Sequence, residues 1–334
     1  MSFRLRKLPY LTQLAVIENM DYRDIFNMSF CSARLAKFIS LAKFKRVLSV
    51  HFLQTSKFIA AQVEESQGTM RMAFVAESND PNDNYPFLTK LGNEIIAFKY
   101  EKDNDGVIYM YKNEAEKNVP QLFAEHVLRL FQQSPLILLG VEFDNRFNNF
   151  LVIPGVRKLK FISGEVNERC VEYINKFLDL ILLVITGPIR TDLLMLQDVS
   201  VVNIMNTDSW GNSILKNVRG QEFLLQNAEF GRNDILEFLR SWISGDKFQT
   251  VTSVRVLFKL DQRGFNWEAV MDEIVLRDHQ IDENAPSRIY RSRFPSIASS
   301  QIETKNYRDV RRTTDQKLAS FDINSTRFAF FVWQ

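Results

Sequence analysis

The 334-residue sequence has few of the residues that form disulfides and metal sites. Its two cysteines, Cys31 and Cys170, exclude a disulfide framework, and we expect both thiols to be small buried groups in a reducing compartment. Three histidines, His51, His126 and His279, lie far apart, and none has a second metal-type ligand at a useful spacing. We therefore expect no bound metal.

Long apolar runs are also missing. The longest, residues 180–185, is six residues and far too short to span a bilayer. The first residues are basic, but the apolar stretch that follows contains Pro9, Thr12 and Gln13, which is not the pattern of a secretory signal. We expect an intracellular protein, in the cytoplasm, the nucleus or both, with no membrane partner.

Motifs of common enzymes are absent too. The twelve glycines form no dinucleotide-binding, phosphate-loop or G-x-S-x-G pattern. The Asp- and Asn-rich stretch at 79–84 lacks the glutamate that closes a calcium loop, so a solvated turn is the preferred interpretation. We expect no cofactor and no catalysis, although a site assembled from distant residues stays an open alternative.

Phenylalanine, by contrast, is abundant, with 28 copies against 4 Trp and 9 Tyr. Phe has no polar group, so this excess indicates core and partner surface. The net charge of +2 is unevenly spread, because residues 1–57 hold ten basic and three acidic side chains. Such an end can steer an acidic protein or a nucleic acid. The basic residues of this N-terminal segment alternate with apolar ones and lack an aromatic stacking platform. This pattern favours a protein over a nucleic acid as the partner.

The first 47 residues contain three short helical patterns. In the first helix, Tyr10, Leu14 and Ile17 share one face, while Leu11 and Val16 lie on other faces. A short helix that is apolar on nearly all sides predicts a second packing partner. A plain three-helix cap on a larger domain is the alternative.

The segment resembles an F-box, the motif that docks on the Skp adaptor of a cullin-RING ubiquitin ligase. Leu8-Pro9 matches the opening step, and Ser29 matches the start of the linker to the third helix. The resemblance implies that the residues binding the Skp adaptor are Leu8, Pro9, Leu11, Ile17, Met20, Ile25, Phe26 and Ser29.

After the head, residues 41–57 predict a connecting helix, and residues 58–118 predict a strand-rich opening segment. Asn104-Asp-Gly106 between two apolar runs is a strong hairpin signal.

Residues 119–260 alternate strand-like and helical patterns. Aligning the expected inward residue of each strand gives steps of 20, 23, 20, 21 and 31 residues, close to the period of leucine-rich repeats. These inward residues are Leu139, Leu159, Leu182, Val202, Phe223 and Val254. The pattern predicts a parallel sheet covered by helices. A non-repetitive α/β domain is the alternative.

Residues 287–334 predict an antiparallel meander. The helix pattern 233–245, with Trp242 on its apolar stripe, and the block 307–333 resemble the type 2 F-box-associated domain. Gln316 departs from that family, which usually has glycine after Asp315. We expect the arginines of this end to form internal ion pairs rather than a phosphate site. They are Arg288, Arg291, Arg293, Arg308, Arg311, Arg312 and Arg327.

Taken together, the sequence predicts an α/β protein. Residues 3–47 form an F-box, and residues 58–334 form an irregular leucine-rich-repeat-like domain that ends in a β-meander. The resemblance implies a non-catalytic adaptor of an SCF-type ubiquitin ligase, which binds the Skp adaptor, and cullin through it, and recruits an unidentified protein target. A stand-alone scaffold is the alternative, and a nucleic-acid-binding protein is the least favoured one.

Overall fold

A computed structural model describes residues 7–42, 44, 46–66, 68–78, 84–103, 106–112, 117–132, 136–144, 150–191, 199–217, 219–259, 273, 289–292, 301–303 and 307–333. The protein is mixed α/β and divides into two compact units, with Lys160 ending unit 1 and Phe161 beginning unit 2. The boundary falls inside strand β8 (Val156–Ser163). The boundary predicted between the head and the following domain, near residues 47–58, therefore lies within unit 1.

Three helices form the head of unit 1, as the sequence predicts: α1 (Tyr10–Glu18), α2 (Tyr22–Cys31) and α3 (Ala33–Ile39). Short polar side chains start two of them. The Asp21 carboxylate accepts a hydrogen bond from the Arg23 amide at 2.8 Å, and the Ser32 hydroxyl accepts one from the Leu35 amide at 3.1 Å. The next elements are β1 (Val47–Gln54), β2 (Phe58–Glu65), β3 (Gly68–Ser78), β4 (Phe87–Leu91), β5 (Glu94–Asp103), β6 (Gly106–Lys112), α4 (Val119–Leu130) and β7 (Ile137–Phe143).

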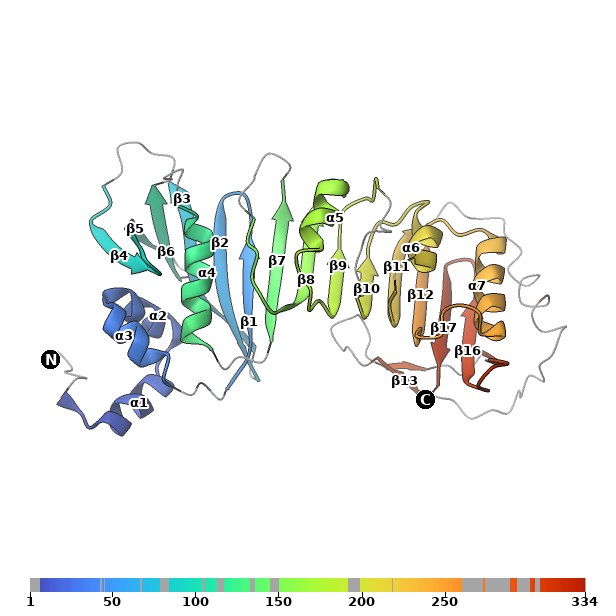
Figure 1. Cartoon of the computed structure of the whole chain (residues 1–334), viewed down its shortest axis with the longest axis horizontal. Helices are drawn as coiled ribbons and strands as arrows, with labels where there is room; N and C mark the ends of the chain where they lie inside the picture. The colour runs from blue at the N-terminus through green and yellow to red at the C-terminus, as the bar shows by residue number, and fades with distance from the viewer. Residues whose placement is uncertain are drawn as a thin grey trace. The chain divides into compact units, whose positions relative to one another are not determined.

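The strands of unit 1 lie in the order β4-β5-β6-β3-β2-β1-β7 (Figure 1). The β5–β6 pair is antiparallel, which confirms the predicted hairpin. The helix expected at residues 41–57 is wrong, because Val47–Gln54 form β1 instead. β1 lies between β2 and β7 and pairs with both. Its burial does not follow its hydrophobicity, because Ser49 and Gln54 are buried while Leu48 is 48% exposed, so the sequence shows no clean two-residue period.

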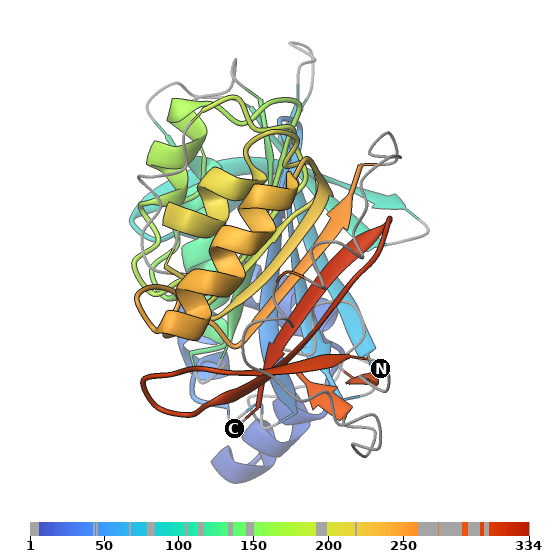
Figure 2. The ribbon, with the colours of Figure 1, turned by 90° about the vertical axis from the view of Figure 1, so that its right-hand side faces the viewer.

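Unit 2 contains α5 (Glu168–Ile174), β9 (Leu182–Ile185), β10 (Val201–Ile204), α6 (Gly211–Asn217), β11 (Glu222–Ala228), α7 (Arg232–Ser244), β12 (Ser253–Phe258), β13 (Ile289–Arg291), β14 (Gln301–Glu303), β15 (Arg308–Arg311), β16 (Leu318–Ile323) and β17 (Arg327–Val332). Strands β9 to β12 are parallel and adjacent in chain order. Helices α5, α6 and α7 lie on one side of these strands (Figures 1 and 2). The predicted parallel sheet with covering helices is therefore present.

The predicted register of this sheet is right in three strands and wrong in one. Val202 pairs with Phe223, and Phe223 pairs with Val254. Val202 pairs on its other side with Leu183, not with Leu182. Strand β9 reads Leu-Leu-Val-Ile, so its two faces are equally apolar and the sequence does not reveal which one faces the helices.

The terminal meander is confirmed. Strands β15, β16 and β17 pair antiparallel, and β17 also pairs with β12, so β17 is bonded along both edges. Gln316 adopts a left-handed backbone with φ of 59°. This is a backbone conformation that favours glycine.

Two of the arginines near the end form the predicted ion pairs. Arg312 donates to Asp315 at 2.6 and 2.8 Å and holds the pKa of that carboxyl well below its usual range. Arg327 lies 3.3 Å from Asp322. Residues 79–83, His279, Arg288 and Arg293, which the sequence singles out, lie outside the described residues.

Candidate functional site

The eight residues implied to bind the Skp adaptor fall into two groups in unit 1. Pro9 and Leu11 are exposed, Leu11 by 77%, while Leu8 and Met20 are half-buried. The remaining four are buried, and they are Ile17, Ile25, Phe26 and Ser29. The head therefore offers only part of the implied set to a partner in this conformation.

The buried group is held by contacts that the sequence alone does not reveal. The Phe26 ring packs edge-on against Tyr109 of β6 and Phe123 of α4, at centroid distances of 5.7 and 5.5 Å. Phe30, one turn later in α2, packs on Tyr109 and stacks on His126. Helix α2 is thus fixed to the sheet of unit 1 and to α4, and its buried side chains stabilise unit 1.

Ser29 lies in the last turn of α2 rather than in a linker, and it contacts a histidine. The Ser29 hydroxyl donates to the Phe26 carbonyl at 2.6 Å, and Ser29 Oγ lies 2.7 Å from His126 Nε2. Because the hydroxyl proton is already donated, His126 Nε2 carries a proton and donates to Ser29. Burial, with a smaller effect of the Arg129 charge, lowers the His126 pKa to about 4, so the ring is neutral at pH 7. The pair is a packing contact, because neither group can activate the other as a nucleophile.

A second cluster of serine, histidine and carboxylate lies on β1 and β2. The Ser49 hydroxyl donates to the Glu64 carboxylate, and His51 Nε2 lies 3.0 Å from the same oxygen. The hydrogen bond from Ser49 is the largest cause of the lowered Glu64 pKa. Ser49 Oγ also lies 2.7 Å from His51 Nε2, but Ser49 is fully buried and donates its proton to the Glu64 carboxylate, so in this structure the hydroxyl is a buried hydrogen-bond donor.

The exposed apolar side chains of the head are the feature available to a partner. Tyr10 and Leu11 begin α1 and are 53% and 77% exposed. Tyr10 packs edge-on against Phe38 of α3 at 5.6 Å, which orients its ring on the head surface. Leu41, directly after α3, is 52% exposed. Two of these residues, Tyr10 and Leu41, are missing from the implied set, although the all-round apolar pattern of the first helix includes Tyr10.

Both cysteines were expected to be buried, and only Cys170 is; burial raises its pKa. Cys31, the last residue of α2, is exposed. Among the described residues, no group of three or more His, Cys, Asp or Glu side chains is placed to hold a metal ion. The described helices are all too short or too polar to cross a membrane.

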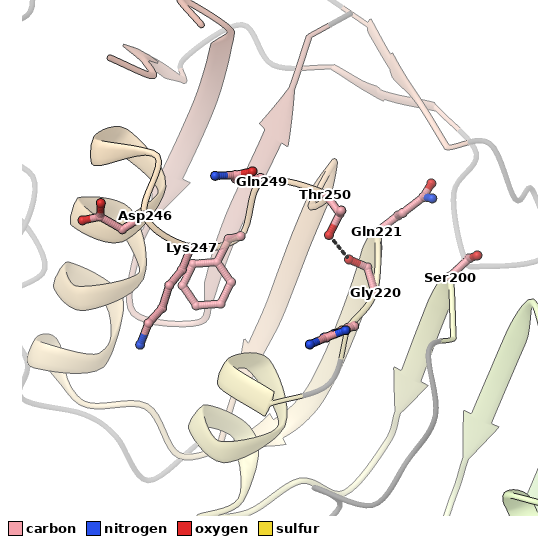
Figure 3. A pocket seen from close by; sticks show the side chains of 9 residues that line it. Ser200, Gly220, Gln221, Asp246, Lys247, Gln249 and Thr250 are labelled. Carbon is pink, nitrogen blue, oxygen red and sulfur yellow. Dashed lines mark hydrogen bonds between the residues drawn. The ribbon is translucent and has the colours of Figure 1, made fainter. Parts of the chain in front are cut away.

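Unit 2 carries a polar hollow of about 700 Å³ at the amino-terminal ends of its parallel strands (Figure 3). Ser200, Gln221 and Thr250 contribute from the segments just before β10, β11 and β12, and the Thr250 hydroxyl donates to the Gly220 carbonyl at 3.3 Å. Residues 246–249, which follow α7, form the other wall. The hollow is open and mixed in charge, with Arg219, Lys247 and Asp246, so no single ligand class is indicated.

The resemblance to an F-box protein rests on the sequence of this chain alone. No protein-family model, no curated protein and no solved structure matches the chain.

Proposed function

We propose that this protein is a substrate-recognition adaptor of an SCF-type ubiquitin ligase, without catalytic activity of its own. The three-helix head is an F-box that binds the Skp adaptor and, through it, cullin. The following irregular leucine-rich-repeat-like α/β region with its terminal meander recruits a protein target. The ligase chemistry belongs to other subunits.

One observation carries the proposal, namely the apolar start of α1. A solvated helix of this length would carry polar residues at its first positions, yet Leu11 is 77% exposed beside the half-exposed Tyr10. These residues follow the Leu8-Pro9 step that opens the F-box pattern. Burying an exposed leucine in an interface contributes about 1.5–3 kcal/mol, enough to favour a specific partner.

The exposed and the buried residues of the head are proposed to have different roles. We propose that Leu8, Pro9, Tyr10 and Leu11 meet the adaptor, while Phe26 and Ser29 fix α2 to the rest of unit 1. The basic charge of residues 1–57 supports an acidic partner, because opposite charge speeds encounter.

The test is a titration of the purified full chain with the purified Skp adaptor of the same organism. Leu11→Asp should weaken binding by about tenfold or more, and Leu8→Ala combined with Pro9→Ala should abolish it. Leu178→Asp is the matched control, because Leu178 is 78% exposed but belongs to unit 2. Equal binding by Leu11→Asp and wild type, with both folded by circular dichroism, would contradict the role proposed for α1, and absence of binding by the folded wild type would favour a stand-alone scaffold.

A further inference from the structure

Unit 1 contains a hollow of about 440 Å³, lined by helices α3 and α4 and by the segment where β4 turns into β5. Helix α3 lines it with one face, on which Ala33 and Ala36 are too small to fill the space. Helix α4 lines it with His126, Arg129 and Leu130, which share a face at helical spacing. The hollow has the size of a small-molecule site, and all its walls belong to unit 1.

The described residues that line this hollow include three cationic side chains and no carboxylate. The cations come from three elements, with Lys37 on α3, Lys90 on β4 and Arg129 on α4. Among the described residues, neither lysine has an acidic partner, and Arg129 has only a distant one, Glu125, at 3.7 Å. A hollow lined by charges of one sign attracts an ion of the opposite sign. The hollow of unit 2 differs, because Asp246 lies among its cations.

The Arg129 guanidinium lies against the turn that follows β4. Gly92 in this turn has φ of 60°, a backbone conformation that favours glycine. A Cβ atom at Gly92 would lie 3.7 Å from Arg129 Nη2, so the guanidinium and the turn are in contact distance. A guanidinium can present two N–H groups to one phosphate, and lysine ammonium groups add point charges. The three cations therefore suit a phosphate group better than a single carboxylate.

His126 adds a hydrogen-bond acceptor to these positive surroundings. Its side chain is only 5% exposed, and Nε2 donates to Ser29. The neutral ring therefore has a lone pair on Nδ1, to which no described residue donates. A phosphate dianion has no proton to give to this acceptor, whereas a hydroxyl group has one. Gln132 also lines the hollow and supplies an amide that can bond hydroxyl groups.

We propose that this hollow binds a small phosphate monoester that carries hydroxyl groups, such as a sugar phosphate. Arg129, Lys37 and Lys90 bind the phosphate, which has a charge of about −1.5 to −2 at pH 7. His126 and Gln132 bind hydroxyl groups of the ester. The acceptor on His126 favours such an ester over a phosphorylated peptide, whose phosphate has no hydroxyl beside it. The site goes beyond the proposed function, because it does not use α1 and needs no ligase.

The test is calorimetric titration of the full-length chain with ribose phosphate, glycerol phosphate, ethyl phosphate and inorganic phosphate. Ribose phosphate or glycerol phosphate should bind more tightly than ethyl phosphate, which has the same charge but no hydroxyl. Lys37→Gln combined with Arg129→Gln should weaken this binding by about tenfold or more, because charge-assisted hydrogen bonds are lost. Lys37→Arg combined with Arg129→Lys keeps the charge and should retain more of the affinity.

A matched control and a spectroscopic signal locate the ligand. Arg219→Gln combined with Lys247→Gln removes the same charge from the hollow of unit 2 and should bind as wild type. In a chain labelled at histidine, the side-chain NMR signals of His126 should shift when the ester is added. Those of His51, which lies on β1, should stay in place.

Several results would overturn the inference. They are absence of binding by both hydroxyl-bearing esters, ethyl phosphate binding as tightly as they do, or a folded Lys37 and Arg129 double variant that binds as wild type. Loss of binding in the unit 2 control would place the ligand in the other hollow. A phosphoserine peptide that binds more tightly than every ester would assign the hollow to a protein partner instead. None of these results bears on the Skp adaptor, which is titrated separately against variants of α1.

Discussion

Trp242 is among the largest side chains that unit 2 buries completely. Its ring packs against Phe330 of β17 at a centroid distance of 5.0 Å, and the Arg312 guanidinium lies 5.2 Å from the ring. The indole nitrogen has no hydrogen-bond partner among the described residues. The side chain therefore stabilises unit 2 by its volume and not by its polar group.

This arrangement predicts two different outcomes at one position. Trp242→Ala should lower the free energy of unfolding by about 3–5 kcal/mol, because it leaves a large cavity. Trp242→Phe should be much milder, because it keeps a ring and removes an unpaired donor. Denaturant unfolding of both variants measures this. A nearly unchanged stability in Trp242→Ala would mean that the residue is not structural.

Replacing Gln316 with glycine should stabilise the protein. A residue other than glycine in the left-handed region costs about 1–2 kcal/mol, part of which glycine returns through its larger unfolded-state entropy. Gln316→Gly should therefore raise the free energy of unfolding by about 0.5–1 kcal/mol. Gln316→Val, which puts a β-branched residue at φ of 59°, should lower it. A glycine variant that melts below wild type would show that Gln316 does not occupy the left-handed region.

His126 predicts how the stability of unit 1 depends on pH. Its pKa is about 4 in the folded chain, against 6.5 for an unperturbed histidine. Between these values the unfolded state binds more protons, so stability falls as the pH drops from 6.5 toward 4. The loss is on the order of 3 kcal/mol.

The measurement is the free energy of unfolding at pH 7 and at pH 4.5. His126→Gln should flatten the dependence on pH, whereas His51→Gln, which changes a partly exposed histidine of β1, should keep it. An equal acid sensitivity in His126→Gln and wild type would exclude His126 as its source.

At the scale of elements, β17 is the strand on which the end of unit 2 depends. It pairs with β12 and β16, and all its residues after Arg327 are buried. Deleting residues 325–334 should therefore destabilise the whole of unit 2. Amides from Arg327 to Val332 should exchange slowly with solvent, and rapid exchange of this stretch would show an unpaired tail.

The elements differ in how far local pattern determines them. Helix α7 is predictable because Ile235, Leu239 and Trp242 repeat at helical spacing and Gly245 ends the helix with φ of 79°. Strand β1 is less predictable, because it pairs not only with β2, which follows it directly, but also with β7, which is distant in the sequence. The same reason explains the error at Leu182, where only the neighbouring strands decide which face meets the helices.

At the scale of the whole molecule, the sequence predicts a helical head but not its surface. The apolar start of α1 is visible in the sequence, and Leu11 is indeed exposed. The burial of Phe26 and Ser29 is not visible, because Tyr109, Phe123 and His126 are about 80–100 residues away in the chain. A degenerate motif therefore identifies the kind of segment, and long-range packing selects which of its residues can meet a partner.

The most direct test of the adaptor account is calorimetric titration of the wild-type chain with the purified Skp adaptor. The account predicts saturable binding with one adaptor per chain and co-elution of the two proteins in size-exclusion chromatography. Absence of both heat and co-elution, with a chain shown to be folded, would contradict it.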